Sequence, residues 1–219
     1  MTRPVLLDLF CGAGGAAMGY HQAGFDVVGV DIDDQPNYPF EFVQADALTF
    51  PCDGFDAIHA SPPCQAYSRT RSIWRHQPPS QPPLIHQTRE LLIQSGLPYV
   101  IENVVGAPLI QPIQLCGSSF GLDVRRHRLF ECSFATIMVP PCAHGQQAPR
   151  RFKTHARFDK AQLSPVVHIY GHGGGEGKAI DLWRQAMQVP WMQTRREIRE
   201  AIPPAYTRHI GEYLTRTLR

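Results

Sequence analysis

One cysteine stands in a setting that suits a nucleophile. Cys64 follows Pro62 and Pro63 and comes shortly after an apolar run with the pattern of a buried strand. Proline fixes φ at about −65°, so the pair stiffens the chain that carries the thiol. A thiolate is a strong nucleophile, and a rigid elbow at the end of a strand would aim it. A lone cysteine before a turn can equally be a small buried side chain, so the assignment depends on its surroundings.

A carboxyl group follows another apolar run. Glu102 comes directly after residues 98–101, which have the composition of a buried strand. A buried carboxyl group needs a partner or a function, and burial raises its pKa, so that it can donate a proton near neutral pH. Taken alone, Glu102 could be a satisfied carboxylate at a strand end. Beside Cys64 on an adjacent strand, we expect it to be catalytic.

Two arginines are separated by a single residue. Arg126 and Arg128 lead into a further apolar strand. Successive side chains of an extended chain alternate between its faces, so both arginines are expected on one face. Their planar, permanently charged guanidinium groups could hold a substrate base and the geometry of the site.

The beginning of the chain has the pattern of a ligand-binding turn. An apolar strand over residues 5–10 is followed by glycines, including Gly12 and Gly14, and then by a helical stretch at 16–20. Glycine lets the backbone approach a ligand closely. A second strand ends at Asp31, near the spacing at which doubly wound folds place a carboxylate on a ribose. No lysine follows the glycines, so a nucleoside cofactor without a phosphate chain is favoured.

Five segments together resemble the motifs of the cytosine-C5 DNA methyltransferases, with compact phage-type members nearest. In the family's order they are Asp8–Gly15, Ala45-Asp46, Pro63-Cys64-Gln65 with Ser68 and Glu102-Asn103-Val104, Arg126-x-Arg128, and Ala201–Ala205. Five matches in the right order are hard to explain by chance. This chain has Val124 where the family has a glutamine, which puts the fine positioning of the arginines in doubt.

The resemblance implies S-adenosylmethionine as cofactor and a covalent mechanism. Cys64 would attack C6 of cytosine while Glu102 acts at N3, so that C5 can accept a methyl group. Asp31 replaces the family's glutamate, Ile32 would pack on the adenine and Asp46 would face its amino group. The full cofactor set is Phe10, Gly12, Gly14, Asp31, Ile32, Asp46 and Pro63. The expected substrate contacts are Gln65, Ser68, Asn103, Arg69 and Arg71.

The expected fold is α/β, with a doubly wound and mostly parallel sheet of the S-adenosylmethionine-dependent methyltransferase type. We expect a catalytic and cofactor-binding domain at 1–132, a small target-recognition region at 133–183, and a segment at 184–219 that returns to the catalytic domain. Residues 191–200 suggest a charged surface helix. Apolar residues at helical spacing after Pro203 predict a final helix that packs on the sheet beside the first strand.

Composition favours a protein of the cytoplasm, and the resemblance implies a DNA partner and a bacterial or phage-infected cell. The 219 residues are 43% hydrophobic, but no apolar run approaches the roughly 20 residues that span a membrane. Residues 1–149 carry 8 basic and 13 acidic side chains, whereas residues 150–219 carry 13 and 6. The basic part suits double-stranded DNA, although a solvated surface is equally consistent. The loop at 66–83, with Trp74, is either a surface linker or closes over nucleic acid. We expect a monomer.

No metal site is expected. Six cysteines lack regular pairing and should stay reduced in a cytosolic protein. Cys142 and His144, with Cys132 and Cys116 before them, contain no half-site of the usual zinc spacing.

Two other functions remain open. The same chemistry could act on cytosine in RNA or on a free pyrimidine nucleotide, because the recognition region is short. The second alternative is a DNA-binding module without catalytic activity, although the retained Cys64, Glu102 and arginines argue against it.

Overall fold

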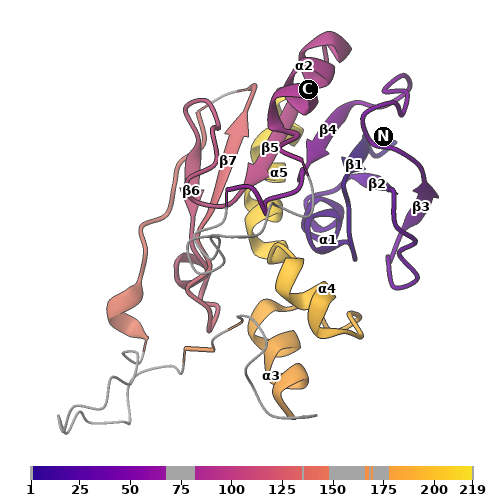
Figure 1. Ribbon diagram of the computed structural model, residues 1–219. Coiled ribbons are helices and arrows are strands. Elements are labelled where there is room, and N and C mark those ends of the chain that lie inside the picture. The colour runs from indigo at the N-terminus through magenta and orange to yellow at the C-terminus, as the bar shows by residue number, and fades with distance from the viewer. Residues whose placement is uncertain are drawn as a thin grey trace, which may run out of the picture.

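A seven-stranded sheet forms the centre of the computed structural model, which describes residues 2–67, 82–134, 136–147, 166, 167, 169 and 178–218. Across the sheet the strands are β3 (Glu41–Gln44), β2 (Asp26–Asp31), β1 (Val5–Leu9), β4 (Ala57–Ala60), β5 (Tyr99–Asn103), β7 (Arg128–Cys132) and β6 (Ile113–Leu115) (Figure 1). The first five are parallel, and β7 is antiparallel to both of its neighbours. The expected doubly wound, mostly parallel α/β fold is confirmed.

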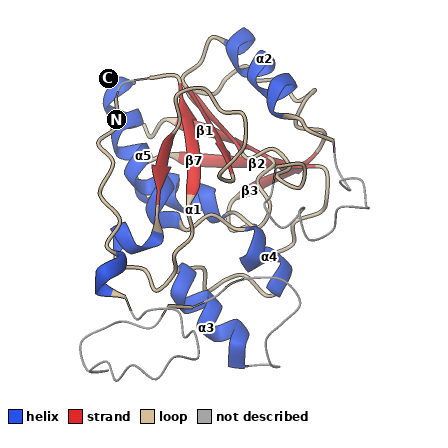
Figure 2. Cartoon of the chain, turned by 60° about the vertical axis from the view of Figure 1, so that its left-hand side comes forward, coloured by secondary structure: helices blue, strands red, loops and turns tan. Residues whose placement is uncertain are grey.

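Both faces of the sheet are covered, which explains why its central strands are almost continuously apolar. Leu6 of β1 belongs to the core formed with α1 (Gly15–Gln22) and α5 (Pro204–Thr217). Its neighbour Leu7 belongs to a second core with α2 (Ile85–Ser95), because successive side chains of a strand point to opposite faces. Figure 2 shows α2 well apart from α1 and α5.

The final helix lies beside α1 and not beside the first strand, where we had expected it. A Cβ atom at Gly19 of α1 would lie 2.1 Å from Thr207 Oγ1 of α5, so the missing side chain allows the close approach of the two helices. Thr207 Oγ1 also donates a hydrogen bond of 2.8 Å to the Ala16 carbonyl. Helix α5 still reaches the sheet at β7, where the rings of Tyr206 and Phe130 are 6.2 Å apart.

The segment before α5 contains two helices where one was expected. Helix α3 spans Lys178–Met187 and α4 spans only Arg195–Glu200. Residues 191–194 are not helical. The left-handed Gln188 (φ 59°) and Pro190 end the helical backbone before them, and a capping box at Thr194 begins α4. Much of the expected recognition region at 133–183 lies outside the described residues. In the described part of the chain, no helix is long and apolar enough to cross a membrane.

Strand β1 carries a buried carboxyl group. Asp8 is 0% exposed, its Oδ2 accepts a 3.4 Å hydrogen bond from Tyr38, and its Oδ1 has no partner. Burial raises the pKa of Asp8 to about 8, against the hydrogen bond from Tyr38, which lowers it. Burial also lowers the pKa of His59, the register partner of Asp8 on β4, to about 3. Both side chains are therefore mainly neutral at pH 7.

The neutral Asp8 gives a prediction for stability. An acid whose pKa is higher in the folded than in the unfolded protein lowers the free energy of unfolding as pH rises between the two pKa values. For Asp8 this interval runs from about 4 to about 8. His59 acts on stability only below about pH 6.5, its unfolded pKa, so the interval from there to pH 8 isolates Asp8. Over that interval the wild-type free energy of unfolding should fall by about 2 kcal/mol relative to Asp8→Asn. Urea titrations of both proteins would measure it, and parallel pH profiles would contradict it.

Candidate active site

The thiol of Cys64 sits on a loop that is fixed to the neighbouring strand. The loop leaves β4 at Ser61, whose N–H donates to the Leu9 carbonyl of β1. The Asn103 Nδ2 group of β5 then donates a 2.8 Å hydrogen bond to the Pro62 carbonyl. A turn closes after the thiol, where the Tyr67 N–H donates to the Cys64 carbonyl. The cysteine is thereby held at the carboxyl ends of β4 and β5.

The side chain of Asn103 makes contacts inside the protein and not at the expected substrate surface. We expected a substrate contact, but the residue is only 1% exposed and its Oδ1 accepts a hydrogen bond from the Val104 N–H. Both ends of its amide are therefore engaged inside the protein. The structure makes Asn103 a positioning residue for the Cys64 loop.

The carboxyl group of Glu102 is buried next to an arginine. Glu102 is 6% exposed, and its Oε1 lies 3.0 Å from Arg128 Nε. The N–H of Arg128 does not point at this oxygen, which has no hydrogen-bond donor. Burial raises the pKa of Glu102, while the charges of Arg128 and Arg126 and a hydrogen bond with Ser61 oppose the rise.

A chain of hydrogen bonds supports Glu102 from within the core. Ser61 Oγ lies 2.9 Å from His59 Nε2, and His59 Nδ1 lies 3.0 Å from the Tyr20 hydroxyl. If Ser61 gives its only proton to Glu102, the neutral His59 must donate from Nε2 and accept from Tyr20 at Nδ1. Ser61, His59 and Tyr20 are then linked in one direction, and the chain fixes the orientation of the carboxyl group.

Arg126 and Arg128 reach the same region from β7. Because β7 is antiparallel to β5, it begins at the edge where β5 ends, and Glu102 pairs with Phe130. Arg126 donates to the Arg199 carbonyl, while its Nε has no partner. Burial lowers the pKa of Arg126 to about 9, and the nearby charge of Arg128 lowers it further.

The four predicted catalytic side chains form one electrostatic cluster. Burial raises the pKa of the Cys64 thiol, Glu102 raises it further, and Arg128 and Arg126 lower it. The thiol therefore lies within the electrostatic reach of all three charged groups. This arrangement places a nucleophile, a proton donor and two fixed positive charges at one edge of the sheet.

The Gly-rich turn after β1 leaves space for a ligand. Phe10 and Gly12 have left-handed backbones, with φ of 57° and 48°. A Cβ atom at Gly12 would meet nothing within 4 Å, so the backbone faces open space. The Gly12 N–H donates a 3.0 Å hydrogen bond to Asp31 Oδ2, which ties the turn to the end of β2. Gly14 differs, because a Cβ atom there would lie 2.6 Å from Pro39 Cδ, so this glycine is needed for packing.

The groups around this space fit an adenosine-like molecule. Ile32, directly after β2, is 66% exposed and offers an apolar surface. Asp31 accepts one hydrogen bond at each carboxylate oxygen, which leaves lone pairs for ribose hydroxyls. Asp46 accepts from the Leu48 N–H with Oδ1, so its other oxygen is available for an amino group. Pro63, half-buried, joins this region to the Cys64 loop.

The sequence of this region matches a known family. Residues 5–106 match the family described as C-5 cytosine-specific DNA methylase. Over these residues the chain is similar to that family. The matched segment contains the Gly-rich turn, Cys64 and Glu102, so the family resemblance noted in the sequence is confirmed.

One curated protein and two solved structures are also similar to the chain. The chain is 65% identical over 34 residues to the type II methyltransferase M.XorII of Xanthomonas oryzae pv. oryzae, a match that covers 15% of this chain and 8% of that protein. The chain thus spans only a small part of that relative's length. Two crystal structures share the fold, each with a TM-score of 0.59 and 14% identity. They are the Dnmt2 methyltransferase of S. pombe, with 99% of each chain covered, and the methyltransferase EhMeth of Entamoeba histolytica, with 100% covered.

One contact of the Gly-rich turn could not have been predicted from sequence. The Trp191 Nε1 group donates a 2.8 Å hydrogen bond to the Ala13 carbonyl, in the middle of the Gly-rich turn. The two residues are 178 positions apart, and no motif links them. The C-terminal segment therefore supports the cofactor end of the site directly.

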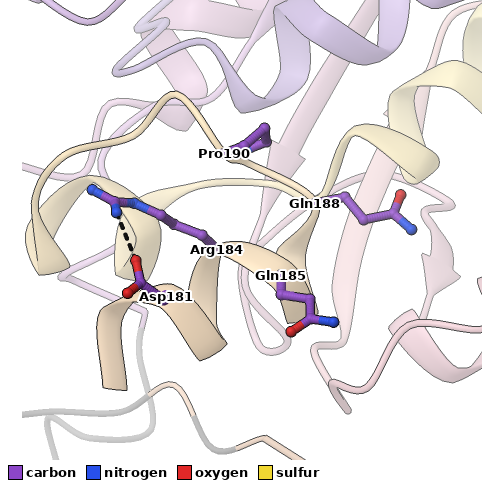
Figure 3. Close-up of a pocket in the computed structure, with 5 residues that line it drawn as sticks. All are labelled: Asp181, Arg184, Gln185, Gln188 and Pro190. Atoms are coloured by element: carbon purple, nitrogen blue, oxygen red, sulfur yellow. Dashed lines mark hydrogen bonds and ion pairs between the residues drawn. The ribbon is translucent and has the colours of Figure 1, made fainter. Parts of the chain in front are cut away.

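Part of the expected substrate surface lies outside the described residues, namely Ser68, Arg69, Arg71 and Trp74. Gln65 is described and exposed, directly after Cys64 in the chain. A surface hollow of about 600 Å³ lies elsewhere, lined by residues of α3 and the turn after it (Figure 3). Its Arg184 is paired with Asp181 at 2.8 Å, and no predicted catalytic residue lines it. We assign the site by its chemistry and not by this hollow.

Proposed function

We propose that the protein transfers a methyl group from S-adenosylmethionine to C5 of a flipped cytosine in DNA, through a covalent bond between Cys64 and C6. One observation carries the proposal: the half-buried Cys64, Arg126 and Arg128 and the buried Glu102 form a single electrostatic cluster. The open turn at Gly12 follows β1, the parallel neighbour of β4, so both lie at the carboxyl edge of the sheet. A base and a nucleoside cofactor could then meet at this edge.

The proposed chemistry uses the proton of Glu102 and the electrons of Cys64. The Cys64 thiolate adds to C6 while Glu102 shares its proton with N3, so that electron density moves to C5. Bound S-adenosylmethionine would supply the electrophilic methyl group for C5 and would leave as S-adenosylhomocysteine, a neutral thioether. Loss of the C5 proton to a base then expels the Cys64 thiolate and restores the aromatic ring.

The local electrostatics support these two roles. Burial raises the pKa of Glu102, which favours its protonated form, and Oε1 receives no hydrogen bond from the described residues. The positive charges of Arg126 and Arg128 lower the pKa of Cys64 against the effect of burial, which favours its thiolate. Both arginines also oppose the rise in the Glu102 pKa. The same charges therefore favour the thiolate of Cys64 and disfavour the protonated form of Glu102.

Duplex DNA is the proposed substrate. A cytosine in a duplex must leave the stack to reach the half-buried Cys64 thiol, at a cost of about a few kcal/mol. Contacts to phosphates from the basic residues of 150–219 would offset this cost. We propose that residues 133–183 select the target, and their short length favours a short recognition sequence.

Bisulfite sequencing of duplex DNA incubated with the protein and S-adenosylmethionine tests the proposal. We expect protected cytosines at one short sequence. Parallel reactions with tritium-methyl cofactor and duplex DNA, RNA or dCMP identify the substrate class. Label in RNA or dCMP alone would reject duplex DNA, and label in none would favour a silent module.

Cofactor binding gives a separate prediction. Asp31→Asn removes the negative charge that would accept ribose hydroxyls, and it weakens the anchor for the Gly12 N–H. Loss of a charged hydrogen bond of about 1.5–3 kcal/mol should weaken S-adenosylhomocysteine binding by roughly 10- to 100-fold in calorimetry. Asp33→Asn, at an exposed carboxylate two residues away, is the matched control. Equal affinity of both variants would remove Asp31 from the cofactor site.

A further inference from the structure

Four metal-binding side chains converge outside the catalytic cluster. Cys116, His127, Cys142 and His144 each offer one ligand atom, and these atoms all lie within 4.8 Å of one another. Cys116 Sγ is 3.2 Å from His144 Nε2, and Cys142 Sγ is 3.5 Å from His127 Nε2. Two thiols and two imidazoles are the ligand set of a common structural zinc site.

The spacing of these atoms suits a zinc ion. Zinc binds sulfur at about 2.3 Å and imidazole nitrogen at about 2.0–2.1 Å, so the ligand atoms of a tetrahedral site lie roughly 3.3–3.8 Å apart. The two distances between sulfur and nitrogen are 3.2 and 3.5 Å. The rings of His127 and His144 are nearly perpendicular, at 79°, so their nitrogen atoms approach the centre from different directions.

Neighbouring groups hold the ligands as a metal site requires. The Ala143 N–H donates a 3.1 Å hydrogen bond to Ser118 Oγ, which lies 3.2 Å from Cys116 Sγ. Since Ser118 accepts from the backbone, its own proton is free to be donated to the sulfur, which favours a thiolate. Arg125 Nη2 donates to the His144 carbonyl at 3.0 Å and fixes the loop that carries two of the ligands.

We propose that Cys116, His127, Cys142 and His144 bind a structural zinc ion, which joins the end of β6, the beginning of β7 and the loop at 140–147. This proposal stands apart from the proposed function. His127 lies between Arg126 and Arg128, and side chains of an extended chain alternate. The arginines face Glu102 while His127 faces Cys142, so the metal would fix the backbone that positions both arginines.

The sequence pattern had led us to expect no metal. It offered Cys132 as a ligand, but Cys132 is at the far end of β7, where it pairs with Val100, and is not part of the cluster. His127 takes its place. A single histidine between two arginines carries no zinc spacing, so only the fold reveals it.

Metal analysis of the full-length protein, purified without chelator, tests the proposal. We expect one zinc ion per chain by mass spectrometry of the metal. Cys142→Ser and His144→Ala should each lower the zinc content by at least about tenfold after dialysis against a weak chelator. Cys52→Ser, at a half-buried cysteine far from the cluster, should keep it. Cys142→His should restore binding, because imidazole is also a zinc ligand, and this rescue separates ligation from packing of the thiol.

A second readout does not depend on activity. Replacing zinc by Co²⁺ should give the strong visible absorption of a tetrahedral site and a band from thiolate ligation, both absent from Cys142→Ser. A protein that folds normally, as judged by circular dichroism, but contains no zinc and takes up no cobalt would overturn the proposal. A disulfide between Cys116 and Cys142 in the freshly purified protein would overturn it as well.

Discussion

Cys64→Ser should abolish methyl transfer and leave cofactor binding intact. A serine hydroxyl has almost no alkoxide form at neutral pH, so the attack on C6 is lost, and we expect the rate to fall by at least about 10⁴-fold. The proposed cofactor contacts around Gly12 and Asp31 do not involve this thiol. Transfer of tritium-labelled methyl groups to DNA measures the rate, and calorimetry with S-adenosylhomocysteine measures binding.

The covalent bond itself can also be detected. Duplex DNA with 5-fluorocytosine at the target should become trapped on the wild-type protein, because fluorine at C5 cannot leave as a proton does. The adduct should survive denaturing electrophoresis and be absent with Cys64→Ser. Cys52→Ser, at another half-buried free cysteine, serves as the matched control. Normal turnover of Cys64→Ser would disprove the assignment of the nucleophile.

Glu102→Gln should lower the rate of transfer by roughly 10²- to 10⁴-fold, the usual contribution of a general acid. An amide occupies the same volume beside Arg128 but cannot share a proton with N3. Single-turnover measurements are needed, because they separate the chemical step from product release. Glu90→Gln, at an exposed carboxylate of α2, is the control.

The pH profile distinguishes the acid from a merely structural carboxylate. In the wild type, ionisation of Cys64 should raise activity with pH, while loss of the Glu102 proton should oppose that rise and produce a decline at high pH, because burial raises the pKa of both groups. Glu102→Gln has no proton to lose, so its residual activity should lack the decline at high pH. An unchanged decline in the variant would assign that limb to another group.

Sequence was sufficient where the information was local. Strands β1 and β4 are buried on both faces, so their apolar runs are unambiguous, and the glycines and Cys64 mark the turns that follow. The prediction of one helix over residues 191–200 was wrong at its beginning. The left-handed Gln188 and Pro190 end the helical backbone before this segment, so α4 begins only at Arg195.

Contacts between distant segments could not be predicted. The residue types identified Asn103 and Gly14 as parts of a site, but only the fold gives Asn103 the Pro62 carbonyl and Gly14 the ring of Pro39 as partners. The same holds for His127, whose possible ligand partners come from separate loops. A motif fixes which residue is present, while its partner is set by tertiary packing.

The support of the Gly-rich turn by the C-terminal segment has a consequence for biosynthesis. Ala13 and Ala16 receive hydrogen bonds from Trp191 and Thr207, the second across 191 positions. Trp191 and Thr207 are synthesised long after the turn, so these two hydrogen bonds cannot form until nearly the whole of residues 1–207 has left the ribosome. Contacts of such long range slow folding, and until they form the exposed apolar strands are vulnerable to aggregation.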